Sequence, residues 1–182
     1  QGQLVKADQW LAETELATRR ITQPVARRIA ISGRASAAGQ RGDVAASAVW
    51  LTQLDELQPD LDFMLVETAS GRAWALHCLG RPGEARDCIR SVVEWAITAD
   101  EPVAALMGLT EACRLGDGKW AADQIERVAG ADEIEGPMAA AQRLFVRAHG
   151  GRLGGPFLAA ATEFGALGAH VLAAEAASMA AT

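Results

Sequence analysis

The sequence predicts an all-α protein, a solenoid of antiparallel helix hairpins with about ten helices. Three observations lead to this fold class. Alanine is abundant, tyrosine is absent and β-branched residues do not gather in alternating runs, a composition that favours helices over strands. Glycine-rich turns recur at intervals of 34 to 41 residues. Four prolines stand where the first helix of each interval is expected to begin.

Four glycine-rich turns set the repeat. The turns begin at Gly39, Gly80, Gly116 and Gly150. Their spacings are therefore 41, 36 and 34 residues. A glycine at the end of a helix adopts the left-handed conformation without the penalty of a Cβ atom, so each turn is expected to end one helix and lead into the next. Asp43 and Glu84 follow the first two turns, where a negative charge stabilises the start of a helix.

The expected elements follow in order along the chain. Leu4, Ala7 and Leu11 form an apolar face that predicts a first helix over 3–20. The hairpins are expected over about 25–57, 61–98, 102–130 and 137–165, with a final helix over 169–182. The prolines that mark the first helix of each hairpin are Pro24, Pro59, Pro102 and Pro137. In the second helices apolar residues recur at helical spacing, as in Ala85, Ile89 and Val92.

This period and layout are typical of a tetratricopeptide-like solenoid, in which each hairpin contacts only its neighbours. We expect a single helical-repeat domain over residues 1–182. The stretch 173–182 holds one charge, that of Glu175, whereas a free-standing solenoid needs a polar terminal face. The chain is therefore expected to be a fragment of a longer polypeptide, or to cover this end by self-association as a homodimer.

Composition and charge exclude several classes of protein. Half of the 182 residues are apolar and 22% are charged, which predicts a folded soluble protein. No apolar run approaches the roughly 20 residues that span a bilayer, and no secretory pattern opens the chain. Three cysteines, Cys78, Cys88 and Cys113, are too few and too dispersed for a disulfide framework. Buried free thiols and a cytoplasmic location are expected.

The net charge of −6 argues against nucleic acid as a direct partner. Residues 1–43 nevertheless hold seven basic and four acidic side chains, a balance of +3. The basic residues of interest are Arg19, Arg20, Arg27, Arg28, Arg34 and Arg41. Two interpretations stay open for this set. Its members either lie on solvated helix faces, or they form a docking face for an acidic neighbour or a weak contact with a phosphate backbone.

Side chains suited to catalysis or metal binding form no recognisable pattern. His77 and His149 lie near helix ends, where the helix dipole explains them, and no C-x-x-C or H-x-x-x-H spacing accompanies them. The glycines of 150–155 lack the preceding strand and the Lys-Ser/Thr pair of a phosphate-binding loop. Carboxylates are scattered at helical spacing without pairing. The sequence therefore predicts no enzyme activity, no catalytic residue, no cofactor and no bound metal.

The tryptophans have two interpretations as well. Trp50, Trp74 and Trp95 fall on apolar helix stripes, which favours core packing over the wall of a ligand groove. Trp10 and Trp120 are expected to be partly exposed.

One segment resembles a known family. Residues 157–170, with the sequence FLAAATEFGALGAH, and the alanine-rich helix over 172–181 resemble the end of the tetratricopeptide-like region in large LuxR-type bacterial regulators of the MalT-like ATPase class. The resemblance implies a sensor or autoinhibitory arm that binds a small-molecule inducer, flanking ATPase and helix-turn-helix domains, or another subunit. The resemblance also implies that this arm relays the bound state to a DNA-binding function located elsewhere. The chain itself holds neither a Walker A motif nor a recognisable helix-turn-helix.

Three other functions stay open beside this one. The first is a stand-alone adaptor that binds a protein segment in its groove. The second is a nucleic-acid contact through the Arg19 to Arg41 face. The third is an enzyme with a dispersed active site. A membrane partner is not expected.

Overall fold

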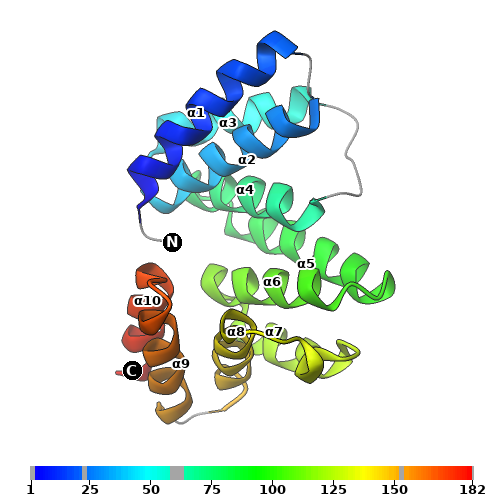
Figure 1. Ribbon diagram of the computed structural model, residues 1–182, viewed down its shortest axis with the longest axis vertical. Helices are drawn as coiled ribbons and strands as arrows, with labels where there is room; N and C mark the ends of the chain where they lie inside the picture. The colour runs from blue at the N-terminus through cyan, green and yellow to red at the C-terminus, as the bar shows by residue number, and fades with distance from the viewer. Residues whose placement is uncertain (1–2, 22–23, 58–63, 152–153, 182) are drawn as a thin grey trace. The chain divides into compact units, whose positions relative to one another are not determined.

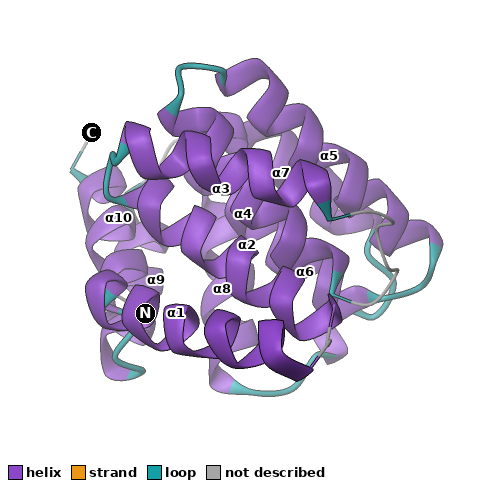
Figure 2. Cartoon of the chain, turned by 90° about the horizontal axis from the view of Figure 1, so that it is seen from above, coloured by secondary structure: helices purple, strands orange, loops and turns teal. Residues whose placement is uncertain are grey.

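The computed structural model describes residues 3–21, 24–57, 64–151 and 154–181. Throughout these residues the chain is helical, with short turns and no strand, which confirms the predicted all-α class (Figures 1 and 2). The chain forms two compact units, Gln3–Val92 and Val93–Thr182, and the boundary between them falls inside the helix α5 (Pro82–Thr98). We call these the N-terminal unit and the C-terminal unit. The single domain predicted over 1–182 stays a prediction.

The N-terminal unit is built from α1 to α4 and the first part of α5. The bounds are Leu4–Ile21 for α1, Pro24–Gln40 for α2, Val44–Glu56 for α3 and Leu65–Cys78 for α4. Within this unit α2 contacts α1, α3 and α4, so it forms the middle of the packing. It begins at Pro24, as the sequence predicted, because a proline at the first helical position loses no hydrogen bond. Pro59 lies outside the described residues.

The helices α2 and α4 pack with their backbones in close approach. A Cβ atom on Gly71 of α4 would lie 2.2 Å from the Oγ atom of Ser32 on α2 and 2.3 Å from its carbonyl oxygen. Likewise, a Cβ atom on Gly39 of α2 would lie 2.4 Å from the carbonyl oxygen of Trp74. The hydroxyl of Ser32 donates to the carbonyl oxygen of Glu67 at 2.8 Å, so this buried polar group is satisfied across the contact.

Gly39 therefore has a packing role and not the turn role that the sequence predicted. The left-handed residue of this turn is Gly42, at φ 72°, whereas Gly39 is a buried residue within the last turn of α2. Asp43 caps α3 as predicted, because its side chain accepts a hydrogen bond at 3.0 Å from the amide three residues later. In the next turn Gly80 is left-handed, at φ 74°, and Glu84 lies in the first turn of α5, as predicted.

The C-terminal unit contains the rest of α5 and the helices α6 to α10. The bounds are Pro102–Ala112 for α6, Gly118–Gln124 for α7, Pro137–Ala148 for α8, Gly155–Ala166 for α9 and His170–Ala180 for α10. Between α6 and α7 the chain kinks at Gly116, where φ is 82°. Two short 3₁₀ turns, Ile125–Arg127 and Ala131–Glu133, follow α7. Within the unit α6 contacts α7 and α8, α8 contacts α9, and α9 contacts α10.

Aromatic rings fill the core of the C-terminal unit. Phe145 and Phe164 are fully buried, and their ring centroids lie 5.9 Å apart at an interplanar angle of 71°. Phe157 meets Phe145 edge-on at 6.2 Å, and the His149 ring lies 4.8 Å from that of Phe157. This edge-to-face geometry aligns the positive edge of one ring with the negative face of the next. The cluster joins α8 to α9.

A buried arginine joins the last helix to the middle of the C-terminal unit. The side chain of Arg114, only 4% exposed, lies in the turn after α6. Its Nε atom donates to Glu175 of α10 at 2.8 Å, and its Nη1 atom donates to Glu111 of α6 at 2.9 Å. Burial lowers the pKa of Arg114, but the two carboxylates outweigh that effect and raise the pKa above its ordinary value. The guanidinium therefore stays charged in the interior.

The tryptophans are distributed largely as the sequence predicted. Trp74 is buried in the core, while Trp50 and Trp95 are half-buried. Trp10 is 63% exposed and Trp120 is half-buried. The half-buried Trp50 has a polar partner, because the guanidinium carbon of Arg34 lies 3.9 Å from its ring centroid.

Candidate functional site

The arginines that the sequence singled out all belong to the N-terminal unit. Arg19 lies on α1, Arg27, Arg28 and Arg34 lie on α2, and Arg41 directly follows α2. Arg20 also belongs to α1, but its side chain lies outside the described residues. The five described side chains have three different environments: three form an ion-pair network, one contacts a helix end and one lines a surface pocket without an ion pair.

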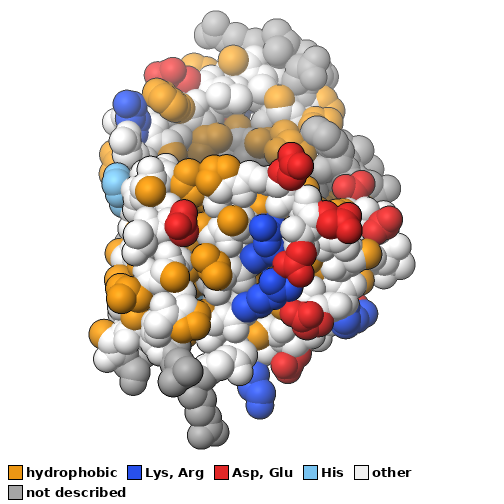
Figure 3. All heavy atoms as spheres, turned by 60° about the horizontal axis from the view of Figure 1, so that its bottom comes forward, with side chains coloured by type: hydrophobic (Ala, Val, Ile, Leu, Met, Phe, Trp, Pro, Cys, Tyr) orange, Lys and Arg blue, Asp and Glu red, His pale blue; other side chains and the backbone are white. Residues whose placement is uncertain are grey.

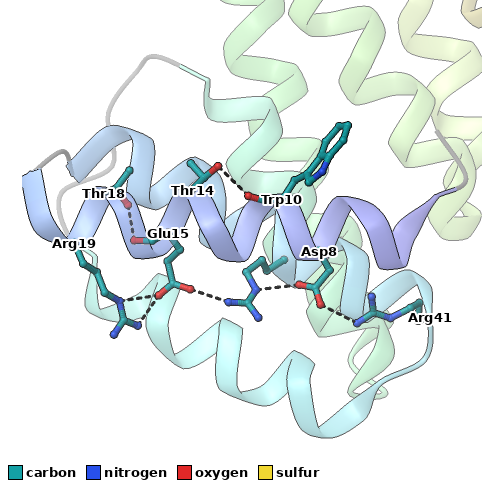
Figure 4. A network of polar contacts seen from close by, with 8 residues as sticks. Asp8, Trp10, Thr14, Glu15, Thr18, Arg19 and Arg41 are labelled. Carbon is teal, nitrogen blue, oxygen red and sulfur yellow. Dashed lines mark hydrogen bonds and ion pairs between the residues drawn. The ribbon is translucent and has the colours of Figure 1, made fainter.

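Three of the arginines form an arginine–carboxylate network with Asp8 and Glu15 (Figure 4). Arg34 lies between the two carboxylates, with its Nε atom 2.9 Å from Asp8 and its Nη1 atom 2.8 Å from Glu15. Arg19 donates from Nε to Glu15 at 3.0 Å, and Arg41 approaches Asp8 at 3.5 Å. The two carboxylates are seven residues apart on α1, so they share one helix face.

Burial makes this network a structural element. The Glu15 side chain is 5% exposed, and Arg34 is also held against the face of Trp50 on α3. Arg34 thereby connects α1, α2 and α3. Three positive and two negative charges leave the network with a net charge of +1, so two of its three arginine charges are neutralised within the fold. A docking role for the whole set stays a prediction.

Arg28 serves the end of α3. It is buried, and its Nη1 atom donates to the carbonyl oxygen of Leu57, the residue that follows the last turn of α3. Burial, and after it the nearby positive charge of Arg72, lowers the pKa of Arg28 from its ordinary value. The carbonyl groups at a helix end lack intrahelical partners, so this contact satisfies one of them. Arg28 is therefore a capping residue.

Arg27 has a different environment, because it lines a surface pocket of about 460 Å³. The residues that line this Arg27 pocket are Arg19, Arg27, Val49, Thr52, Gln53 and Glu56. Among the described residues, Arg27 has no ion pair, and its buried Nε atom has no hydrogen-bond partner. The Oε1 atom of Gln53 is likewise buried without a partner. Two residues of the pocket wall thus each have a buried polar atom without a partner.

The four α3 residues of this pocket were missed by sequence reasoning. Val49, Gln53 and Glu56 are spaced i, i+4 and i+7, and Thr52 is adjacent to this stripe, so they lie on one helix face. That spacing is the only local signal for them. It predicts a shared face but not that α2 brings Arg27 against it.

A second pocket, of about 640 Å³, lies in the C-terminal unit. Its lining residues are Asp100, Pro102, Val103, Ala129, Gly130, Glu133, Ile134 and Glu135. Apolar side chains form part of the wall and three carboxylates contribute negative charge. Asp100 has a left-handed backbone, at φ 56°, which is uncommon for a residue other than glycine. No sequence pattern predicted this pocket, since its residues come from separated turns.

The cysteines and histidines do not add a chemical centre to these pockets. All three cysteines are free thiols, with Cys113 buried and Cys78 and Cys88 half-buried. Burial raises the pKa of the Cys88 and Cys113 thiols, so they are poorly nucleophilic at neutral pH. Within the described ranges no group of three His, Cys, Asp or Glu side chains is placed to hold a metal ion. In the same residues no helix has the length and apolar character needed to cross a membrane.

Comparison of the chain with protein-family models, with curated proteins and with solved structures gives no match.

Proposed function

We propose that this chain is the sensor and protein-interaction module of a larger LuxR-type transcriptional regulator. In this proposal its hairpins form a tetratricopeptide-like solenoid in the cytoplasm. The module binds an inducer or neighbouring domains, and it relays its state to DNA binding located elsewhere in the polypeptide.

The order of helix contacts is the observation that carries the proposal. In the N-terminal unit α2 contacts its hairpin partner α3 and also α4, the first helix of the next hairpin. In the C-terminal unit α6 contacts its hairpin partner α7 and also α8, again the first helix of the next hairpin. A recurring contact between successive first helices is typical of helical-repeat proteins, which present extended surfaces to partners. This pattern supports a binding module.

Exposed apolar side chains support a protein partner in particular. Among the residues that the structure describes, the large exposed hydrophobic ones are Val5, Trp10, Leu16, Val44, Val49, Val103, Met138, Leu144, Leu158 and Leu167. One face of the molecule carries hydrophobic side chains between charged ones of both signs (Figure 3). Trp10 is the largest exposed side chain of this set, and tryptophan is enriched at the energetic centres of protein interfaces. We therefore place the expected anchor for a neighbouring domain at Trp10 on α1.

The test measures binding between this chain and the flanking segments of its own reading frame, each expressed separately. Isothermal titration calorimetry is expected to give a saturable complex with at least one flanking segment. Trp10→Ser should weaken that complex by at least about tenfold, the loss expected of an interface anchor. The matched control is Glu13→Ser on the same helix, which removes an exposed polar side chain and should leave the affinity unchanged.

Two results would contradict the proposal. One is a reading frame that encodes neither an ATPase nor a helix-turn-helix domain beside this chain. The other is a set of flanking segments that show no heat of binding. The first would leave the adaptor function open, because an adaptor needs no fused DNA-binding domain.

A further inference from the structure

The Arg27 pocket contains a guanidinium that has no ion pair or hydrogen bond with any residue that the structure describes. Among the five described arginines of the N-terminal cluster, Arg19, Arg34 and Arg41 pair with carboxylates and Arg28 donates to a backbone carbonyl. Arg27 has neither kind of contact within the described residues, and its Nε atom is fully buried. A buried donor without an acceptor is unfavourable in the free protein. Arg27 as a whole is half-buried and lines the pocket, so a ligand with a negative charge can pair with the accessible part of its guanidinium.

The acceptor that best matches a guanidinium is a carboxylate. The planar fork of N–H donors on an arginine matches the two oxygens of a carboxylate, and the charge strengthens each hydrogen bond. Arg19 lines the same pocket and adds a second positive charge. Gln53 contributes an amide at the same site, and its buried end lacks a partner. Whichever way this amide is turned, it adds one donor group and one acceptor to the recognition of a polar head.

The remaining wall limits what the rest of the ligand can be. Val49 is 52% exposed and lines the pocket, so it offers an apolar contact for a hydrocarbon body. Thr52 uses its hydroxyl to donate to the carbonyl oxygen of Ala48 at 3.1 Å, so it does not offer this donor to a ligand. Glu56 adds one negative charge to the wall, which disfavours a second carboxylate on the ligand. The volume of about 460 Å³ falls within the range of small-molecule sites.

We propose that the Arg27 pocket binds a small monocarboxylic acid with an apolar body, whose carboxylate is held by Arg27 and Gln53 and whose hydrocarbon part lies on Val49. This inference deepens the proposed sensing function and rests on it for the biological purpose of the ligand. The binding itself is a property of this chain alone, so it is measured without any flanking domain.

The experiment is an NMR titration of the uniformly ¹⁵N-labelled chain, observing backbone amides and the arginine Nε–Hε signals. The probes are hexanoate, the neutral analogue 1-hexanol, the dicarboxylate adipate, and acetate, which lacks the apolar body. Hexanoate is expected to shift the Arg27 Nε–Hε signal and the amides around Val49 and Gln53, with saturation. Hexanol and acetate should each bind at least about tenfold more weakly, and adipate more weakly than hexanoate.

Variants test the assignment of roles. Arg27→Gln should weaken hexanoate binding by about ten- to hundredfold, the loss expected for a charged hydrogen-bond partner. Arg86→Gln, on α5 and outside the pocket, is the matched control and should bind hexanoate like the unaltered chain. Val49→Asp places a negative charge at an exposed position of the pocket and should also abolish binding. It keeps the test decisive if circular dichroism shows that Arg27→Gln does not fold.

Three outcomes would overturn the proposal. They are the absence of any hexanoate-dependent shift, equal affinity of the unaltered chain and Val49→Asp, and acetate binding as tight as hexanoate. The last result would mean that the pocket recognises a bare carboxylate, such as the side chain of an acidic protein. Hexanoate binding without any complex with flanking segments would refute the proposed relay function alone. A complex without hexanoate binding would refute the ligand alone.

Discussion

The two units hold their helices together by opposite means. In the N-terminal unit α2 and α4 approach so closely that Gly39 and Gly71 have no room for a Cβ atom. In the C-terminal unit α8 and α9 are separated by the rings of Phe145, Phe157 and Phe164, which fill the space between them. One unit excludes side chains from its central helix contact, and the other depends on large ones.

The two units also differ in how far their charged groups are buried. The arginine–carboxylate network of the N-terminal unit has partly exposed members, including Arg19 and Arg41, and it lies over α1 and α2. The C-terminal unit instead holds the buried guanidinium of Arg114 between two carboxylates. Each unit is therefore sensitive to a different kind of substitution. Added atoms should damage the contact between α2 and α4, and removed ring atoms should damage the contact between α8 and α9.

The largest effect is expected from Phe145→Ala. This substitution removes a fully buried ring that contacts Phe157, Phe164 and His149, and it leaves a cavity in the aromatic cluster. The free energy of unfolding of the C-terminal unit should fall by about 3–5 kcal/mol. Urea denaturation followed by circular dichroism measures the loss. Hydrogen exchange should show it first in the amides of α8 and α9.

Leu144→Ala is the matched control on the same helix. Leu144 is 39% exposed, so its truncation should change the free energy of unfolding by no more than about 0.5 kcal/mol. Equal losses for the two variants would contradict an aromatic core as the main support of this unit.

The next effect concerns the buried charge of the C-terminal unit. Arg114→Met keeps most of the side-chain volume but removes the guanidinium that contacts Glu111 and Glu175. We expect a loss of about 2–3 kcal/mol in the free energy of unfolding, because the carboxylates then lose a charged donor in a poorly solvated site. Thermal and urea denaturation measure it.

Arg147→Met provides the comparison, since Arg147 pairs with Asp132 on the surface of the same unit. Exposed ion pairs contribute little, so this variant should be much less affected than Arg114→Met. A neutral outcome for Arg114→Met would mean that the buried pair does not hold α10 in place.

Gly71→Ala tests the opposite rule in the N-terminal unit. The added methyl group would lie 2.3 Å from the carbonyl oxygen of Ser32, so α2 and α4 would have to separate. We expect the free energy of unfolding to fall by about 1–3 kcal/mol, although alanine has the higher helix propensity. The control is Gly83→Ala in α5, where nothing lies within 4 Å of the added atom. That variant should be neutral or more stable by up to about 1 kcal/mol.

A stable Gly71→Ala chain would show that α4 can shift on α2 without cost. Opposite signs of the change in the free energy of unfolding for Gly71→Ala and Gly83→Ala therefore test the close packing of α2 and α4 most directly.

The sequence predicted the helical class and several helix starts because these are local properties. Pro102 and Pro137 begin α6 and α8, and Asp43 caps α3, as the local chemistry requires. The roles of Gly39 and Gly71 were not predictable in this way. A glycine inside a helix has no local signature of close packing, because the reason for it lies on another helix.

The candidate site was predicted only in part for a similar reason. The arginine set is visible from its charge, but charge alone does not distinguish solvated helix faces from a docking face. The spacing of Asp8 and Glu15, seven residues apart on one helix, was a usable sign that two carboxylates face the same way. Arg34 faces the carboxylates of α1, whereas Arg27 lines a pocket with residues of α3. Only the tertiary structure shows this difference.

The smallest effect is expected from pH, through His149 in the C-terminal unit. Burial lowers the pKa of His149 below its ordinary 6.5, although the hydrogen bond to the carbonyl oxygen of Phe145 offsets part of this. In the neutral ring Nδ1–H donates to that oxygen, and the buried Nε2 has no partner among the described residues. Above pH 6.5 both folded and unfolded chains hold a neutral ring, so stability is at its full value. As the pH falls below 6.5 the unfolded chain takes up a proton first, and stability decreases until the folded pKa is passed.

The midpoint of urea unfolding, measured between pH 7.5 and 5.5, tests this expectation. The window lies above the titration of carboxylates such as Asp132, whose pKa is lowered by its hydrogen bond with Arg147. His149→Leu removes the titrating group, so its own midpoint should change less with pH than that of the unaltered chain. Hydrogen exchange should assign the pH-dependent loss to α8 and not to α2 or α4. Equal pH dependence in the two chains would mean that His149 remains solvated, and that the aromatic cluster is open to water at this edge.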